Sequence, residues 1–138
     1  MILHTTLIML WTFFFQTDSI EGTWITTDDE TGNQKSEVLI FKENEKLYGK
    51  ITKLLLPEDQ GKKCINCKGK NKDQSIVGML IINDLQLDDY SWEDGTILDP
   101  KSGKVYDCNI GFEDSNTLKV RGYIGFSLLG RTQIWKRK

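Results

Sequence analysis

The spacing of glycine near the end of the chain constrains the fold more than any other feature. Three glycines, at positions 122, 125 and 130, interrupt an otherwise apolar and aromatic stretch, and Trp135 and Arg137 follow it. Glycine is unfavourable inside a strand and marks a bend, a bulge or a close approach of two backbones. The stretch therefore predicts a strongly curved sheet. Gly22 stands two residues before Trp24 near the other end of the domain, so the first and last strands are expected to be neighbours in a closed barrel.

The rest of the chain shows the pattern of short strands joined by tight turns. Leu47, Gly49 and Ile51 alternate with polar residues, and the run from Asp99 to Gly103 has the proline and glycine of a turn. The expected strands span residues 21–27, 35–42, 46–56, 75–86, 90–98, 104–112, 117–126 and 130–137. Regular spacing without a convincing amphipathic helix predicts an all-β fold, a small up-and-down antiparallel β-barrel of about eight strands.

The first residues of the chain have the composition of an export signal. Residues 2–15 are nearly all apolar and carry no charged side chain, yet the run is too short for a comfortable membrane span. We expect a signal peptide at 1–19 and a single β-barrel domain at 20–138, with no integral membrane domain after cleavage. The protein is then exported, to the periplasm or outside the cell. An uncleaved anchor and a structural N-terminal strand are the alternatives.

Histidine is absent from the expected domain, because His4 is the only one in the chain. That absence excludes Ser-His-Asp and Cys-His catalysis and most metal sites built on imidazole. The net charge of −2 indicates no overall preference for nucleic acid. We therefore expect no catalytic residue, no metal site, no cofactor and no nucleic-acid partner.

Two of the three cysteines lie close together in a polar, lysine-rich loop, at Cys64 and Cys67. In an exported protein the favoured interpretation is a local disulfide between them. A bridge to Cys108, a redox-active pair and a metal site are the alternatives. Cys108 is expected on the apolar face of a strand together with Tyr106, Ile110 and Phe112, as a buried and inert thiol.

Several blocks of sequence resemble a known bacterial family. They are Gly22-Thr-Trp24, Leu47-Tyr-Gly-Lys-Ile51, Cys64-Ile-Asn-Cys67-Lys-Gly69, Ile76-Val-Gly78, Leu98-Asp-Pro-Lys-Ser-Gly-Lys-Val-Tyr106, Leu118-Lys-Val-Arg-Gly-Tyr-Ile-Gly125 and Leu129-Gly-Arg-Thr-Gln-Ile-Trp135. Together they are similar to the exported family catalogued as domain of unknown function 2147. The resemblance implies a small exported protein and supplies no reaction.

The Gly-x-Trp opening also resembles the first strand of lipocalins. That resemblance implies that Trp24 closes one end of the barrel beneath an arginine from near the last strand, either Arg131 or Arg137.

The candidate residues for a ligand site or a barrel end are aromatic or charged residues in the expected strands and turns. They are Trp24, Tyr48, Trp92, Asp99, Arg121, Tyr123, Arg131 and Trp135. Each has a structural alternative: Asp99 can bond within its own turn, and the arginines can stack on tryptophan instead of binding an anion.

A small barrel holds one ligand or is filled by its own side chains. We expect a non-catalytic protein that binds a small apolar or anionic ligand, or a component of the cell envelope, in the barrel or at its mouth. The alternatives are a structural or protein-interaction module with a solid core, and a thiol-dependent enzyme.

Overall fold

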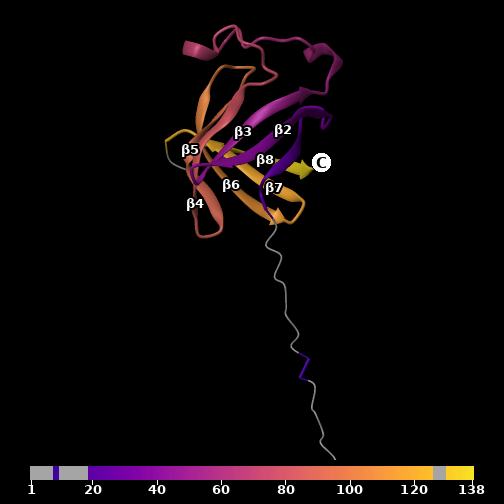
Figure 1. Ribbon diagram of the computed structural model, residues 1–138. Helices are drawn as coiled ribbons and strands as arrows, with labels where there is room; N and C mark the ends of the chain where they lie inside the picture. The colour runs from indigo at the N-terminus through magenta and orange to yellow at the C-terminus, as the bar shows by residue number, and fades with distance from the viewer. Residues whose placement is uncertain (1–7, 10–18, 126–129) are drawn as a thin grey trace, which may run out of the picture.

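Eight antiparallel strands follow one another around a closed barrel, and each is hydrogen-bonded to its neighbours in sequence (Figure 1). The computed structural model describes residues 8–9, 19–125 and 130–138. The strands are β1 (Gly22–Thr27), β2 (Gln34–Glu43), β3 (Lys46–Leu54), β4 (Leu80–Asp88), β5 (Ser91–Leu98), β6 (Val105–Asp114), β7 (Thr117–Tyr123) and β8 (Gly130–Arg137). The prediction of an eight-stranded up-and-down barrel is confirmed.

The first and last strands close the barrel, as the sequence predicts. Trp24 and Ile25 of β1 lie opposite Arg137 and Lys136 of β8. Gly130 shows why glycine is needed near this seam: a Cβ atom there would lie 2.4 Å from the carbonyl oxygen of Gly122 in β7. No side chain fits at that distance, so β7 and β8 approach closely only because position 130 is glycine.

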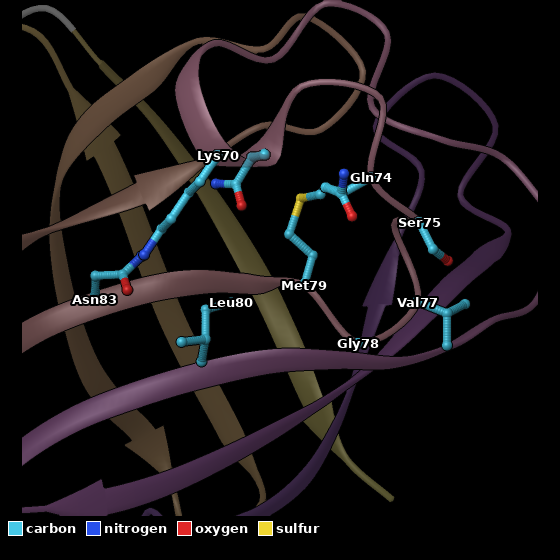
Figure 2. Close-up of a pocket in the computed structure, with 9 residues that line it drawn as sticks. Lys70, Gln74, Ser75, Val77, Gly78, Met79, Leu80 and Asn83 are labelled. Carbon is cyan, nitrogen blue, oxygen red and sulfur yellow. The ribbon is translucent and has the colours of Figure 1, made fainter.

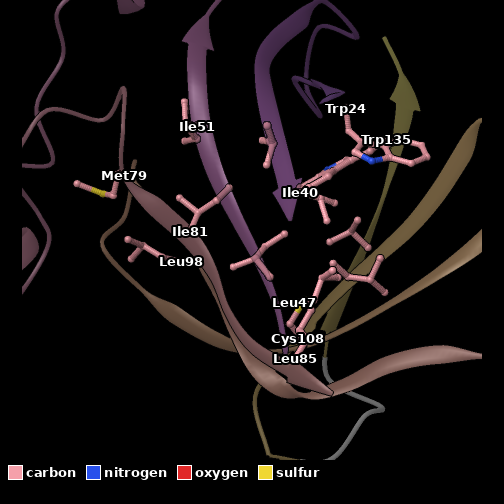
Figure 3. Packing of buried hydrophobic residues seen from close by; sticks show 14 of the residues in the cluster. Trp24, Ile40, Leu47, Ile51, Met79, Ile81, Leu85, Leu98, Cys108 and Trp135 are labelled. Atoms are coloured by element: carbon pink, nitrogen blue, oxygen red, sulfur yellow. The ribbon is translucent and has the colours of Figure 1, made fainter. Parts of the chain in front are cut away.

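Alternation along each strand sends one set of side chains into the barrel. The interior at its centre is filled by large apolar groups, as Figure 3 shows. Fully buried members include Trp24, Ile40, Leu47, Ile82, Leu85, Ile110, Leu118 and Trp135. The alternation predicted for Leu47, Gly49 and Ile51 is confirmed, since all three are buried.

Two expectations about individual segments need correction. The strand expected from residue 75 begins at Leu80. Ile76 and Met79 belong to the loop before it, where their side chains pack against the core and the backbone of Met79 still bonds to Ile51 of β3. On β6, Cys108 and Ile110 are fully buried, whereas Tyr106 is half-buried and Phe112 is 39% exposed. β6 therefore extends beyond the core, and its outer positions reach the rims.

The two ends of the barrel are built differently. At the end where β1 begins and β8 ends, here called the capped end, short turns join the strands. The opposite end, here called the mouth end, carries residues 55–79 between β3 and β4, here called the lid loop. It contains two short 3₁₀ turns, η1 (Pro57–Asp59) and η2 (Gly69–Asn71). In Figure 1 the lid loop extends beyond the strands, next to the β5–β6 turn.

The described residues contain no helix that is long and apolar enough to cross a membrane. The predicted signal peptide, residues 1–19, lies outside the described residues apart from 8, 9 and 19.

Candidate functional site

Trp24 closes the capped end, as the lipocalin resemblance implies. Its indole is fully buried and its Nε1 donates a hydrogen bond to the carbonyl oxygen of Ile20, at 2.9 Å. The guanidinium of Arg137 lies over the ring, 4.3 Å from its centroid. The indole face attracts the cation electrostatically, so Trp24 is held both by its burial and by its stacking with Arg137.

Arg137 joins three separate segments at this end. Its guanidinium donates to the carbonyl oxygen of Ser19 at 2.9 Å and to that of Ser115 at 3.0 and 3.2 Å. A longer bond of 3.4 Å reaches the carbonyl oxygen of Glu21. The side chain thus ties the start of the domain and the β6–β7 turn to the last strand. Of the two predicted arginines, Arg137 is the one that meets Trp24.

Two other predicted tryptophans are also structural by their contacts. Trp92 is buried near the capped end, with the ammonium of Lys42 5.5 Å from its ring centroid. Trp135 is buried inside the barrel, and its Nε1 donates to the side-chain oxygen of Gln133 at 3.1 Å.

Tyr48, Arg121 and Tyr123 lie on the outer wall, because each alternates with buried or inward-facing neighbours on its strand. The Tyr48 hydroxyl donates to Asp84 at 2.8 Å, which raises the pKa of Tyr48 above its usual value. Arg121 donates to the Thr132 hydroxyl at 3.2 Å. Burial, with a smaller contribution from nearby carboxylates, raises the pKa of Tyr123.

Asp99 and Arg131 lie at the mouth end. Asp99 accepts bonds from the backbone of Lys101 at 3.0 Å and from the Ser102 hydroxyl at 2.8 Å, as expected for a residue that stabilises its own turn. Arg131 is exposed and lies 3.2 Å from the Asp29 carboxylate. The eight predicted residues are therefore divided among the capped end, the interior, the outer wall and the mouth end. Their role in ligand binding stays a prediction.

The cysteines are arranged as the favoured interpretation predicts. Cys64 and Cys67 form a disulfide with their Cα atoms 5.3 Å apart, and Cys108 is a free, buried thiol. Burial raises the pKa of Cys108 to about 12, so its reactive thiolate is scarce at neutral pH. Within the described residues no three His, Cys, Asp or Glu side chains are placed to hold a metal ion.

The disulfide belongs to a lid loop that is packed against the barrel. Cys64, Cys67, Ile76 and Met79 are all buried and join the same apolar cluster as the barrel interior. The Asn66 side chain donates to the carbonyl oxygen of Lys101 at 2.9 Å, and Cys64 Sγ lies 3.2 Å from the carbonyl oxygen of Pro100. The loop is thus fixed to the β5–β6 turn.

A groove of about 390 Å³ lies between the second half of the lid loop and the start of β4 (Figure 2). Its apolar surface comes from Val77, Met79 and Leu80. Val77 and Leu80 are both exposed, whereas Met79 is buried and reaches the core cluster. The groove, here called the lid groove, therefore combines an accessible apolar wall with a floor that is continuous with the core.

Polar side chains surround this apolar surface. Lys70 and Asn71 come from the lid loop and Asn83 from β4. Figure 2 shows the Lys70 side chain extending toward Asn83. Among the residues that the structure describes, none of these three side chains has a hydrogen-bond or ion-pair partner. An ammonium and two amides beside an apolar wall can bind an amphipathic molecule with an anionic or polar group.

A second groove, of about 470 Å³, lies toward the capped end, where Lys42, Lys46, Leu87 and Trp92 are among the residues that line it. Here the tryptophan already has the Lys42 ammonium over its ring. The second groove therefore differs from the lid groove in that a cation already covers its aromatic ring.

Sequence reasoning did not identify the lid groove. Lys70 lies in a lysine-rich stretch that resembles a solvated loop, and Val77 to Leu80 resembles the start of a strand. Val77 is exposed although the neighbouring Ile76 is buried, and the apolar sequence does not distinguish the two. Lys70 lies near Asn83 because of the path that the loop takes across the barrel end. No local pattern signals that contact.

Comparisons with known proteins agree with this fold. The sequence model of a family described as "Uncharacterized protein conserved in bacteria (DUF2147)" matches residues 22–137. No curated protein matches the chain. Among solved structures, the protein HP1028 from the human pathogen Helicobacter pylori, described as belonging to the lipocalin family, is similar with a TM-score of 0.77. The two are 22% identical over 88% of this chain and 84% of that one, a likeness that shows the fold.

Proposed function

This chain belongs to the bacterial DUF2147 family of uncharacterized proteins, and we propose that it is an exported, non-catalytic binding protein. Its ligand is a small amphipathic molecule with an apolar part and an anionic group. The lid groove is the site. The observation that carries this proposal is the apolar wall of Val77 and Leu80 beside the Lys70 ammonium, which has no partner among the described residues.

The packed interior supports a site at the barrel end. Ile40, Leu47, Ile110 and Leu118 are fully buried across the centre and take up the space that a central ligand would need. The lid groove has the volume of a small-ligand site and a pair of amides to orient a polar group. A lipocalin-like barrel suits ligand binding, and here the mouth end offers the better place.

The same packing also favours the alternative of a protein-interaction module with a solid core. The two proposals differ in what native mass spectrometry of protein purified from its own host would detect. A retained small molecule appears as added mass and supports ligand binding. Retention of another polypeptide, without added small mass, supports the module.

The state of the three cysteines gives little support to the alternative of a thiol-dependent enzyme. Two are joined in a buried disulfide, and the third has its pKa raised to about 12 by burial. A nucleophilic cysteine needs a populated and accessible thiolate. These observations support a non-catalytic role.

The lid groove is tested with anilinonaphthalene sulfonate, a fluorescent probe that has apolar rings and one anionic group. We expect Lys70→Gln to weaken binding by about five- to tenfold, because a charge-assisted hydrogen bond is lost at a partly hydrated site. Lys119→Gln is the matched control, since Lys119 is an exposed lysine on β7. Equal dissociation constants for the two variants would rule out Lys70 as the counter-ion.

Export predicts a shorter mature chain. Arg137 binds the Ser19 carbonyl and Ile20 is buried, so both residues are needed to complete the capped end. We expect cleavage between about residues 16 and 20, toward the start of that window if the cap is kept whole, and the intact mass of the exported protein measures the cut. A species beginning at Met1 in that fraction would contradict the proposal, and a start after Ile20 would contradict the role of the cap.

A further inference from the structure

The lid loop presents an exposed apolar side chain among lysines. Ile65 is 64% exposed although the cysteines on either side of it, Cys64 and Cys67, are buried. Lys63, Lys68, Lys72 and Lys101 are exposed around it. Ile65 and these four lysines are here called the lysine tip.

The backbone of the tip is held in place. The disulfide links its two ends. The backbone amide of Cys64 donates to the carbonyl oxygen of Gln74 at 2.8 Å, and the backbone amide of Asp73 donates to the carbonyl oxygen of Cys64 at 2.9 Å. Lys72 Nζ donates to the carbonyl oxygen of Ile65. Ile65 is therefore displayed outward by a fixed frame.

The charge of this region differs from that of the whole protein. Residues 57–79 carry five lysines and three acidic side chains, a net charge of +2, whereas the chain carries −2. Asp59 is paired with Lys62 at 2.7 Å, whereas Asp99 accepts bonds from neutral groups of its own turn and keeps its negative charge near Lys101. Asp73 and Asp99 offset two of the four lysine charges, so the tip keeps a net positive charge.

Further apolar side chains are exposed at the same end of the barrel. Val105 opens β6 and is 59% exposed, and Ile124 follows β7 and is 61% exposed. Positive charge interspersed with accessible apolar side chains is the chemistry that binds an anionic lipid surface, because lysine attracts the headgroups and apolar groups enter the acyl boundary.

We propose that the lysine tip docks the mouth end of the barrel onto an anionic phospholipid surface, with Ile65 inserted between headgroups. The tip is separate from the lid groove and does not need a ligand there. Docking nevertheless places the groove close to a membrane, where amphipathic molecules are concentrated.

Sedimentation with vesicles tests the proposal, using the full chain as purified from its producing cell. Vesicles of equal parts phosphatidylglycerol and phosphatidylethanolamine should bind the protein, and phosphatidylcholine vesicles should not. Lys63→Gln with Lys68→Gln should lower the partition coefficient about 25-fold. Ile65→Ser should lower it about tenfold. Raised salt should weaken binding by the unaltered chain.

A charge-matched control is Lys119→Gln with Lys136→Gln, which removes two lysines from β7 and β8 at a distance from the tip. We expect this control to retain most of the binding. Equal loss in both double variants, or equal binding to neutral vesicles, would overturn the proposal. So would binding to a soluble polyanion such as heparin without binding to vesicles.

Amide hydrogen exchange locates the contact independently of the N-terminal apolar segment. Anionic vesicles should slow exchange at residues 62–68 in the unaltered chain, and not in the Lys63/Lys68 double variant. Slowing confined to other regions, or none at all, would also overturn the proposal. Loss of probe binding in Lys70→Gln without loss of vesicle binding would separate the two sites.

Discussion

Replacing Trp24 with alanine is expected to lower the free energy of unfolding by about 3–5 kcal/mol, because removing a large buried aromatic side chain leaves a cavity. Trp24 is fully buried, contacts the ring of Phe112 at 6.2 Å between centroids, and lies beneath Arg137. The loss would leave this arginine without its partner ring and weaken the link between the first and last strands. Urea unfolding measures the change as a shift in midpoint at constant slope.

Two further variants separate the contributions at the capped end. Trp24→Phe keeps an aromatic ring but cannot donate to the Ile20 carbonyl, so we expect a smaller loss, of about 1–3 kcal/mol. Lys68→Ala, at an exposed lysine in the lid loop, should change stability by less than about 0.5 kcal/mol. If Trp24→Ala cost no more than Lys68→Ala, Trp24 would not be the structural closure of the barrel.

Replacing Gly103 with alanine is expected to separate the lid loop from the β5–β6 turn. A Cβ atom at this position would lie 1.9 Å from the carbonyl oxygen of Asn66, and φ is +74°. Both the backbone conformation and the contact exclude a side chain. The loop or the turn must move, and the buried Cys64 and Cys67 lose their packing.

Gly61→Ala is a matched control for this prediction. Gly61 has nearly the same φ, +72°, but no atom lies within 4 Å of its added Cβ. Gly61→Ala should lower the free energy of unfolding by about 1–2 kcal/mol, from the unfavourable backbone conformation alone. Gly103→Ala should cost about 1–3 kcal/mol more, from the clash. Urea unfolding gives both values, and limited proteolysis within 57–79 reports detachment of the loop. Equal losses in the two variants would mean that the contact with Asn66 is not tight.

The cysteine pair and the closure of the barrel illustrate what local sequence can predict. Cys64 and Cys67 are three residues apart, which limits their geometry before any tertiary contact forms. Trp24 needs an apolar environment and a hydrogen-bond partner, so its burial also follows from its chemistry. The sequence does not indicate whether Arg131 or Arg137 stacks on Trp24, because that depends on the register of β8 against β1.

The lid loop illustrates what local sequence could not predict. Ile76 and Met79 resemble strand residues in the sequence, because loop residues that pack against the core need the same apolar side chains as residues buried in a sheet. The sequence offers Tyr48, Arg121 and Tyr123 as candidate ligand contacts without indicating which face of the barrel they occupy, and their strand phase places them on the outer wall. Whether each such side chain points into or out of the barrel depends on the pleat of its strand and on how the sheet closes.

Local sequence accounts for the short strands, for their alternating side chains and regularly spaced turns, and for the glycines near the end that permit close backbone approach. Those properties are local and depend on a few neighbouring residues. The position of Lys70 near Asn83 and the exposure of Ile65 among lysines follow from tertiary packing instead. These placements depend on how a 25-residue loop packs across the mouth end, and such long-range contacts leave no local pattern in the chain.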